Sequence, residues 1–346
     1  MSIIYFYTTQ NDSPGINKIL STLVNKLKSV NIKSDIVNDI DILDKQQIII
    51  PYGIKDAFYM LQRKYPLNYC IMADAYTIGW LKKISFYIKR FKFNYYDLYY
   101  SMFQVLKYGY KEFNVVKHAK RIMYVSPYDI NKLMNIYPSK KFILIQNGVS
   151  IKSEYIINSD FNNVNPNHEI VLGSLSNWNK TSRDEIRWFI DDYFSKIHKS
   201  NPKIKLLLAG YCSDESLIDY FKSINGVEFL GAVKDLGDFF KRINIFIATL
   251  PKGVGILNKV LDAFAYKKLV IGLPECFNAF PNNKNGFVKF SNYEGFLSAI
   301  DTYVNNKNAV SKMIEISYNY IKNYHDWDEN YNVLIYDILD FYKIPK

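Results

Sequence analysis

The sequence predicts an α/β protein built from two doubly wound domains with parallel sheets. Three observations lead to this expectation: short apolar, β-branched runs alternate with helical patterns, the alternation runs through twice, and a polar, Asn-rich segment separates the two halves. Alternating strands and helices favour parallel sheets that are covered on both faces. A length of 346 residues exceeds what one core usually supports, which also favours two domains. We expect ligands in a crevice at the carboxyl ends of the strands.

The candidate strands are short runs rich in Ile, Val, Leu and aromatic side chains. In the first half they are Ile3–Tyr7, Ile48–Pro51, Tyr69–Ala73, Ile122–Val125 and Phe142–Ile145. In the second half they are Ile170–Leu175, Ile204–Ala209, Val227–Leu230, Ile245–Ala248 and Leu269–Ile271. Apolar residues recur at helical spacing in further segments, which predicts helices over Arg183–His198, Tyr293–Val304, Val310–Tyr324 and Asn330–Tyr342.

These patterns place the first domain at residues 1–150 and the second domain at residues 169–325. The linker between them, residues 151–168, is polar and rich in Asn. The last segment, residues 326–346, contains a helix that we expect to cross back onto the first domain.

Cysteine and histidine usage predicts neither a disulfide nor a bound metal. Cys70, Cys212 and Cys276 are far apart and odd in number, and the four histidines are equally scattered. This usage favours a reducing compartment. The opening residues lack a secretory signal, and no apolar run approaches the ~18 residues needed to span a bilayer. We therefore expect a cytoplasmic protein without a metal ion.

The net charge of +11 is concentrated in one stretch, Lys82–Arg121. This stretch carries ten Lys and Arg against Asp97 and Glu112, a local net charge of +8, and it is interleaved with Phe and Tyr. A basic, aromatic surface can bind an anionic membrane, nucleic acid or an acidic small molecule. We expect no nucleic-acid partner because no recognised nucleic-acid motif appears. Peripheral contact with the inner face of a membrane and a merely solvated face both remain open.

The most informative segment is Gly255–Asp262, where a strand leads through a glycine loop into an amphipathic helix that begins near Ile256. The N–H groups at a helix start favour a phosphate, and Lys259 adds a full positive charge one turn inside. Asp262 lies three residues further along and can accept hydrogen bonds from ribose hydroxyls. The alternative is an ordinary strand–helix turn followed by a solvated aspartate.

The run Gly255-Ile-Leu-Asn-Lys-Val-Leu-Asp-Ala-Phe-Ala265 resembles the nucleotide-sugar motif of glycosyltransferase family 4. The similarity is strongest to a subgroup with the pattern Gly-Ile-x-Asn-Lys-Val-Leu-Glu-Ala-Met-Ala. Further segments resemble the family in the right order: Val125–Asp129, Asn147–Val149, Gly173–Lys180 and Gly231–Asp235. The resemblance implies the GT-B fold, in which two Rossmann-like domains face a central cleft. It also implies retaining transfer of a sugar from a nucleotide-sugar donor, with UDP or GDP as the nucleotide, to a hydroxyl group. If the basic stretch Lys82–Arg121 faces a membrane, we expect the acceptor to be a saccharide or lipid-linked saccharide in cell-surface polysaccharide synthesis.

The resemblance also implies the site residues. The first domain would hold the acceptor and the second the donor. Lys180 and Lys259 would stabilise the leaving diphosphate, since fixed charges aimed at developing charge lower a barrier. Asp74 would be an acceptor-side acid or base, although a helix N-cap is the equal alternative. The donor-binding residues would be Gly15, Gly173, Ser174, Val233, Gly255, Ile256, Leu257, Asn258 and Asp262.

Two positions depart from the family pattern. Val254 stands where the family often has a glutamate, and Ser174 stands where it commonly has an arginine. We expect Lys259 to take over the role of the missing arginine. Two other functions remain open: a nucleotide-sugar epimerase on the same fold, and a basic binding module that has lost catalysis.

Overall fold

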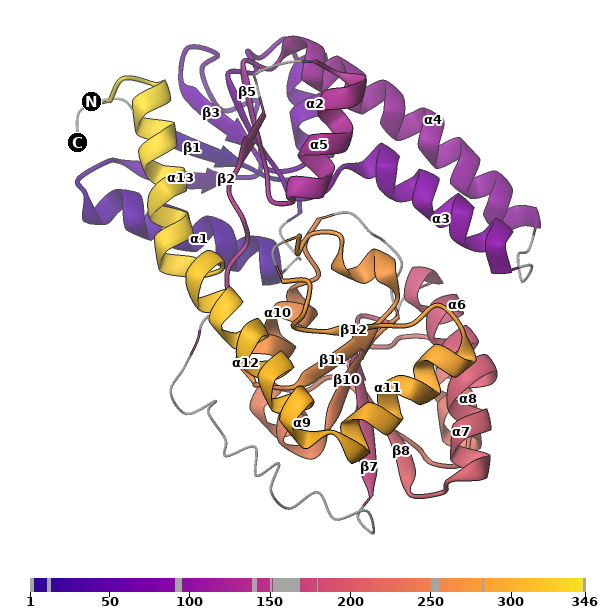
Figure 1. Ribbon diagram of the computed structural model, residues 1–346. Coiled ribbons are helices and arrows are strands. Elements are labelled where there is room, and N and C mark those ends of the chain that lie inside the picture. Colours follow the sequence, from indigo (N-terminus) through magenta and orange to yellow (C-terminus); the bar gives the residue numbers. More distant parts are fainter. Residues whose placement is uncertain are drawn as a thin grey trace. The chain divides into compact units, whose positions relative to one another are not determined.

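The computed structural model describes residues 3–10, 14–90, 95–138, 142–149, 151, 169–178, 180–249, 255–281 and 283–344. The chain divides into two compact units (Figure 1). Unit 1 comprises Met1–Asn147, Val254–Ile256 and Trp327–Lys346, and unit 2 comprises Gly148–Gly253 and Leu257–Asp326. The last helix of the chain therefore groups with unit 1.

Among the described residues, unit 1 has parallel strands in the orders β2-β1-β3 and β4-β5-β6. A parallel bridge between Tyr52 and Ile71 joins the two groups. The chain leaves β1 first to one side and then to the other, which is the doubly wound pattern. The strands are β1 (Ile4–Tyr7), β2 (Ser34–Val37), β3 (Ile48–Pro51), β4 (Tyr69–Met72), β5 (Arg121–Tyr124) and β6 (Phe142–Leu144).

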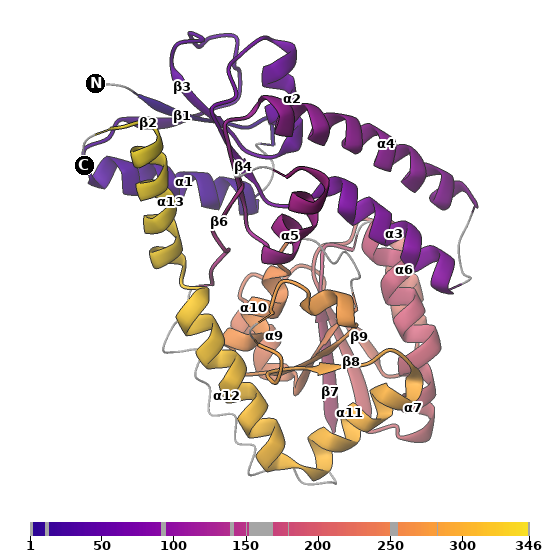
Figure 2. The same ribbon diagram turned by 45° about the horizontal axis from the view of Figure 1, so that its top comes forward.

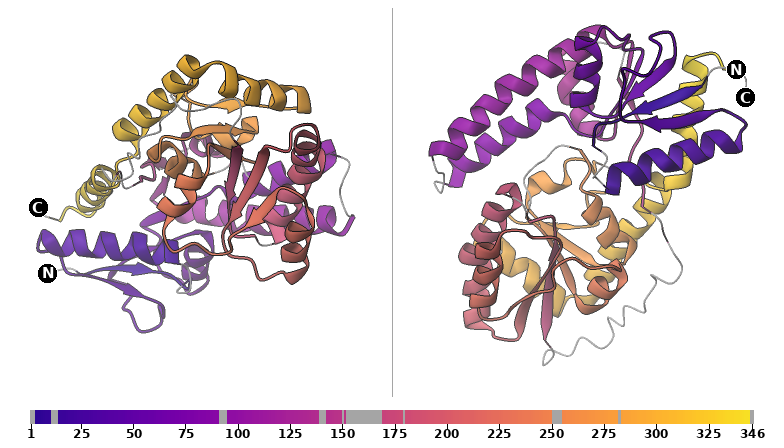
Figure 3. Two further views of the ribbon diagram at one scale, coloured as in Figure 1. Left: turned by 90° about the horizontal axis from the view of Figure 1, so that it is seen from below. Right: turned by 180° about the vertical axis from the view of Figure 1, so that it is seen from behind.

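The helices of unit 1 cover these strands, and α13 is fastened to them by polar contacts. Asp337 of α13 accepts hydrogen bonds of 2.7 Å from Tyr69 of β4 and from Arg121 of β5. Helices α1 and α13 lie side by side (Figures 1 and 3), and Lys26 pairs with Asp328 at 3.1 Å. The helices are α1 (Pro14–Ser29), α2 (Ile54–Gln62), α3 (Tyr76–Arg90), α4 (Tyr95–His118), α5 (Pro127–Ile136) and α13 (Trp327–Phe341).

Unit 2 contains one parallel sheet whose described strands run in the order β12-β11-β10-β7-β8-β9. Strands β10 and β11 are buried at every position, which explains why they read as continuous apolar runs. The sheet is visible in Figure 2 between its helices. The strands are β7 (Ile170–Leu175), β8 (Ile204–Ala209), β9 (Val227–Phe229), β10 (Ile245–Ala248), β11 (Leu269–Gly272) and β12 (Val288–Lys289).

The helix predicted over Arg183–His198 is helical throughout but is not a uniform α-helix. A π-helical turn, Ile190–Phe194, separates α6 from α7 and keeps Ile190, Tyr193 and Phe194 buried. The helices of unit 2 are α6 (Lys180–Phe189), α7 (Ser195–Ser200), α8 (Glu215–Ser223), α9 (Leu236–Arg242), α10 (Asn258–Ala265), α11 (Tyr293–Asn305) and α12 (Lys307–Tyr324).

The sequence patterns miss two strands, β2 and β12, and both lie at sheet edges. Strand β2 carries Ser34 and Asp35 among four residues, and β12 has two residues. An edge strand pairs on one side, so it needs no continuous apolar run. These strands are therefore defined by backbone pairing rather than by burial.

The cysteines carry free thiols, and two of them, Cys70 and Cys276, are buried. Burial raises the pKa of the Cys70 thiol. Within the described ranges, no helix is both long enough and apolar enough to cross a membrane. The same residues contain no group of three or more His, Cys, Asp or Glu that could hold a metal ion.

Candidate functional site

The sheet of unit 2 reverses its winding between β7 and β10. After β7 the chain continues to β8 on one side, and after β10 it continues to β11 on the other. The loops that follow β7 and β10 therefore diverge, and open α/β sheets bind ligands at such a point. Ser176 follows β7, and Lys259 lies in the first turn of α10, after β10. Lys259 Nζ donates a hydrogen bond of 3.2 Å to Ser176 Oγ, across the reversal.

The start of α10 is suited to an anion. Its N-cap, Leu257, makes no side-chain cap hydrogen bond to the described residues. The N–H groups of the first turn and the positive end of the helix dipole thus act together with Lys259. Asn258 is exposed, whereas Lys259 and Asp262 are half-buried.

The turn that follows β11 is close enough to Lys259 for the charge of Lys259 to act on Cys276. Cys276, in the turn Pro274–Phe277, donates to the Ala248 carbonyl at 3.2 Å. Burial is the main cause that raises the pKa of the Cys276 thiol, and the charge of Lys259 opposes it. Glu275 and the buried Glu185 act on the same thiol in the opposite direction to Lys259. The sequence analysis named none of Glu185, Glu275 and Cys276 as neighbours of the site.

Two donor-site predictions fall on β7, inside the sheet. Ser174 is buried, and its hydroxyl donates to the Ile247 carbonyl of β10 at 3.2 Å. Gly173 faces Ile243, and a Cβ built at Gly173 would lie 2.5 Å from Ile243 Cγ2. The structure thus gives both residues a packing role in the sheet next to the site.

Gly173→Ala is expected to destabilise unit 2 by about 1–3 kcal/mol, because overpacking a filled core forces neighbours to shift. Urea unfolding measures the change. Ile243→Ala alone should also be destabilising because it opens a cavity. The double variant should be less destabilised than the sum of the two single changes, since each relieves the other. Simple additivity would contradict the packing role.

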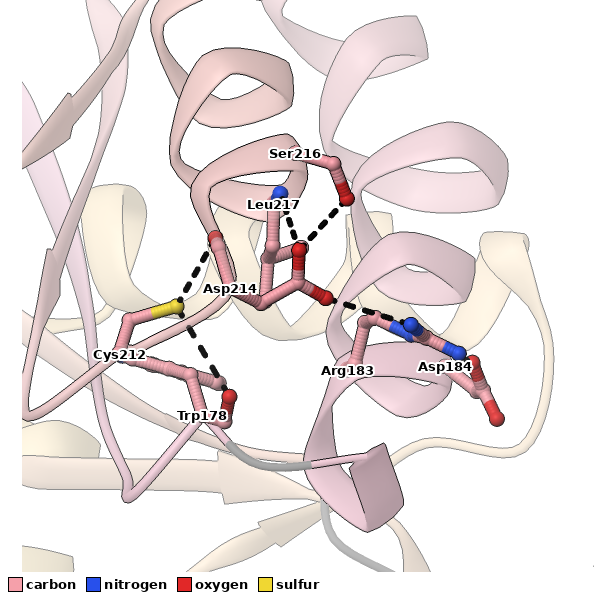
Figure 4. A network of polar contacts seen from close by, with 7 residues as sticks. All are labelled: Trp178, Arg183, Asp184, Cys212, Asp214, Ser216 and Leu217. Carbon is pink, nitrogen blue, oxygen red and sulfur yellow. Dashed lines mark hydrogen bonds and ion pairs between the residues drawn. The ribbon is translucent and has the colours of Figure 1, made fainter.

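The loop after β7 is fixed to the loop after β8 by the network in Figure 4. Asp214 caps α8 by accepting from the Leu217 N–H at 3.2 Å, and it also pairs with Arg183 of α6 at 3.2 Å. The hydrogen bond from Ser216, followed by the Arg183 contact, holds the pKa of Asp214 below its ordinary value. Cys212 Sγ contacts the Trp178 carbonyl at 3.8 Å. The network positions the start of α6.

The remaining unit 2 predictions lie near these loops. Lys180 is the first residue of α6, and its side chain lies outside the described part of the structure. Val233 is half-buried in the loop between β9 and α9, where Asp235 caps α9 through the Gly237 N–H at 2.8 Å. Trp178, in the loop after β7, is 3% exposed, and its indole N–H donates to the Ala209 carbonyl.

Gly255 groups with unit 1, where it meets two aspartates. Its φ is +64°, and a Cβ at this position would collide with Asp74 Oδ1. The Gly255 N–H donates to Asp129 Oδ2 at 2.8 Å, and the Ala75 N–H donates to the same oxygen at 3.2 Å. Glycine is therefore required at position 255 by both its backbone angle and its contact.

Asp129 is the residue here that sequence reasoning missed. It is fully buried, and burial is the main cause that raises its pKa to about 7. The negative charge of Asp74 raises the pKa further, whereas the N–H groups of Gly255 and Ala75 lower it. The signal that could have found it is its position in the segment Val125–Asp129, which resembles a family motif.

Other unit 1 predictions lie at the carboxyl ends of its strands. Gly15 is in the first turn of α1, after β1. Asp74 follows β4 and is half-buried, while Glu112 caps the start of α3 by accepting from the Thr77 N–H at 3.3 Å. A small pocket at the ends of β3 and β4 is lined by Tyr52, Ala73 and Trp327 among others.

The described strands form doubly wound parallel units, and a candidate anion site lies where the unit 2 sheet reverses. Solved GT-B glycosyltransferases share this α/β fold. Residues 169–306 match the family model described as Glycosyl transferases group 1. No curated protein matches the chain significantly in sequence.

Solved structures share the fold over nearly the whole chain. A glycosyltransferase from Rickettsia africae ESF-5 is 15% identical, with 99% of each chain covered and a TM-score of 0.63. The sucrose-phosphate synthase of Thermosynechococcus elongatus is 10% identical, with 100% of each chain covered and a TM-score of 0.71. Anabaena HepE, in complex with UDP and glucose, is 13% identical, with 98% of this chain and 100% of that chain covered and a TM-score of 0.64.

Proposed function

We propose that this protein is a glycosyltransferase that moves a sugar from a nucleoside diphosphate sugar to a hydroxyl acceptor. The observation that carries the proposal is the Lys259–Ser176 contact at the reversal point of the unit 2 sheet. Both residues lie within the range that matches the Glycosyl transferases group 1 model. A cation held beside a helix start at this place is suited to a diphosphate.

In the proposed reaction, the bond between the sugar and the diphosphate breaks, and a bond forms between the same sugar carbon and the acceptor oxygen. The acceptor hydroxyl proton passes to Asp74, and negative charge develops on the oxygens of the leaving diphosphate. Lys259 and the first N–H groups of α10 stabilise that charge, and Ser176 orients the ammonium group. Lys180 is the second proposed cation. Asp262, one turn into α10, is proposed to accept hydrogen bonds from the ribose hydroxyls, with retention at the transferred sugar.

The donor and the acceptor are assigned to different parts of the chain in this proposal. Residues 169–325 bind the nucleotide sugar, with UDP or GDP as the nucleotide. UDP receives support from the fold shared with HepE, whose structure contains UDP and glucose. Residues 1–150 bind a saccharide or lipid-linked saccharide, and Asp74 accepts the proton of its hydroxyl group.

Calorimetric titration with UDP, GDP and ADP tests the donor site. We expect one of these nucleotides to bind, and we expect Lys259→Ala to weaken its binding because the ammonium group faces the phosphates. Lys241→Ala removes the same charge from an exposed position on α9 and should bind like the wild type. Absence of binding to all three nucleotides would favour a binding module instead. Conversion of a sugar nucleotide without any acceptor would favour an epimerase.

A further inference from the structure

Helix α4 carries large apolar side chains on its exposed side as well as on its buried side. Its inward side buries polar residues, Ser101, Gln104 and Glu112, each at most 5% exposed. Its outward side carries large apolar and aromatic side chains that are between 43% and 81% exposed: Tyr95, Tyr96, Tyr99, Tyr100, Met102, Phe103, Leu106, Tyr110 and Phe113. A surface helix normally exposes polar and charged side chains and buries its apolar ones. A contiguous exposed apolar patch marks an interaction site.

These side chains form a stripe along the helix. Tyr99, Phe103, Leu106, Tyr110 and Phe113 follow one another at spacings of four and three residues, which places them on one side of an α-helix. The 24 residues of α4 extend for about 36 Å at the usual rise per residue. The stripe is therefore long enough for an extended surface contact.

Most of the packing that holds α4 in place lies on its inward side, although Tyr110 contacts Phe58 and Phe113 contacts Tyr137 through their rings. The inward side packs Tyr108, Val115 and Val116 into the unit 1 core. Glu112 accepts hydrogen bonds from the Thr77 N–H at 3.3 Å and from the Tyr124 hydroxyl at 3.4 Å. The inner contacts fix the helix, so substitution of the stripe residues Tyr99, Phe103 and Leu106 should leave the fold intact.

The stripe is bordered by positive charge. Lys107, Lys111 and Lys117 lie on α4, and α3 packs beside it with Lys82 and Lys83 (Figures 1 and 3). Burial lowers the pKa of Lys111, and the charges of Lys107 and Lys55 lower it further. Over Lys82–Arg121 the sequence carries ten Lys and Arg against two acids, and one of these acids, Glu112, is buried.

We propose that the outer face of α4 docks on an anionic lipid bilayer. The aromatic and apolar side chains of the stripe enter the interfacial region, where Tyr and Phe are well accommodated. The flanking lysines meet the anionic head groups, each contributing a favourable electrostatic term. A second copy of the chain is a poorer occupant, because a symmetric contact would bring the two sets of lysines together. This inference does not depend on the proposed sugar transfer.

Flotation with vesicles tests the docking. The wild type should float with phosphatidylcholine vesicles that contain 30% phosphatidylglycerol and should bind pure phosphatidylcholine about tenfold more weakly. The triple variant Tyr99→Ser, Phe103→Ser and Leu106→Ser, at three of the exposed stripe positions, should lose binding to anionic vesicles by about tenfold or more. Lys107→Gln with Lys117→Gln should reduce the preference for anionic vesicles. Val333→Ser with Tyr336→Ser, exposed positions on α13, is the matched control and should bind like the wild type.

Two further measurements keep the outcomes distinct. Circular dichroism and nucleotide titration of the triple variant should match the wild type, which separates docking from folding and from the donor site. The proposal fails if the wild type does not float with anionic vesicles at low salt, or if the triple variant floats equally well. It also fails if the wild type sediments as a dimer that the triple variant dissociates while neither protein binds vesicles.

Discussion

Lys259→Ala is expected to lower kcat by about 10²–10³-fold, which corresponds to about 2.7–4 kcal/mol of barrier. The reason is that the Lys259 ammonium group is held at the reversal point of the unit 2 sheet by its 3.2 Å contact with Ser176 Oγ. A charge fixed before the reaction stabilises the leaving diphosphate without a reorganisation cost. The measurement is the steady-state rate of nucleoside diphosphate release from a sugar donor that carries the nucleotide identified by titration.

Two companion variants separate catalysis from folding and from bulk charge. Lys241→Ala removes an exposed lysine of the same unit and should retain the wild-type rate. Ser176→Ala should reduce kcat less than Lys259→Ala, since the ammonium group would remain but would be less well oriented. Full transferase activity of a folded Lys259→Ala protein would remove Lys259 from the proposed mechanism.

The fold was largely predictable because burial determines most of its strands. Strands β10 and β11 are buried at every position, and such strands read as apolar runs whatever their neighbours are. Strand order is different, because it depends on pairings between residues distant in sequence. The register of β10 against β7, with Ile245 opposite Leu172, leaves no trace in either segment alone.

The candidate site was predictable where chemistry and position coincide in one segment. Lys259 and Asp262 stand on one helix after a glycine loop, and this spacing suffices to suggest a phosphate site. Ser176 and Asp129 could not be found in this way, because their partners lie 83 and 126 residues away. Ser174 illustrates the reverse problem. Both faces of β7 are covered, so the strand has no alternation of polar and apolar residues to show which way Ser174 points. The sequence could therefore not show that the Ser174 hydroxyl donates to the Ile247 carbonyl.

Gly255 shows how a residue that the sequence singled out can have a different role in the structure. As a residue of a glycine loop it was expected to let an anion approach the backbone. In the structure its N–H donates to Asp129, and its missing side chain makes room for Asp74. The Gly255 N–H, which the sequence suggested as a phosphate ligand, therefore donates to a carboxylate instead. The N–H groups in the first turn of α10 are the better candidates for binding a phosphate.

The contribution of Asp129 to the stability of the wild type is expected to fall as pH rises from about 4 to about 7. Its pKa is raised from 3.8 to about 7 in the folded protein, chiefly by burial. Below pH 4 the carboxyl is protonated in both states, so it contributes no pH dependence. Between these values the unfolded chain loses a proton that the folded chain keeps, which favours unfolding. The full difference is of the order of 4 kcal/mol and is reached above pH 7.

Asp129→Asn isolates this contribution. The amide oxygen can still accept from the Gly255 and Ala75 N–H groups, but the side chain no longer ionises. Relative to the wild type, the variant should therefore become more stable as pH rises from 5 to 8, as measured by urea unfolding at each pH. Asp56 and Glu112 also have pKa values raised by burial, and their effects cancel in the comparison because both proteins contain them. Asp219→Asn makes the same change at an exposed site of α8 and serves as the control.

A difference in unfolding free energy between wild type and Asp129→Asn that stays constant with pH would show that Asp129 is ionised in the folded protein. The carboxylate would then be held by the two N–H groups strongly enough to outweigh its burial.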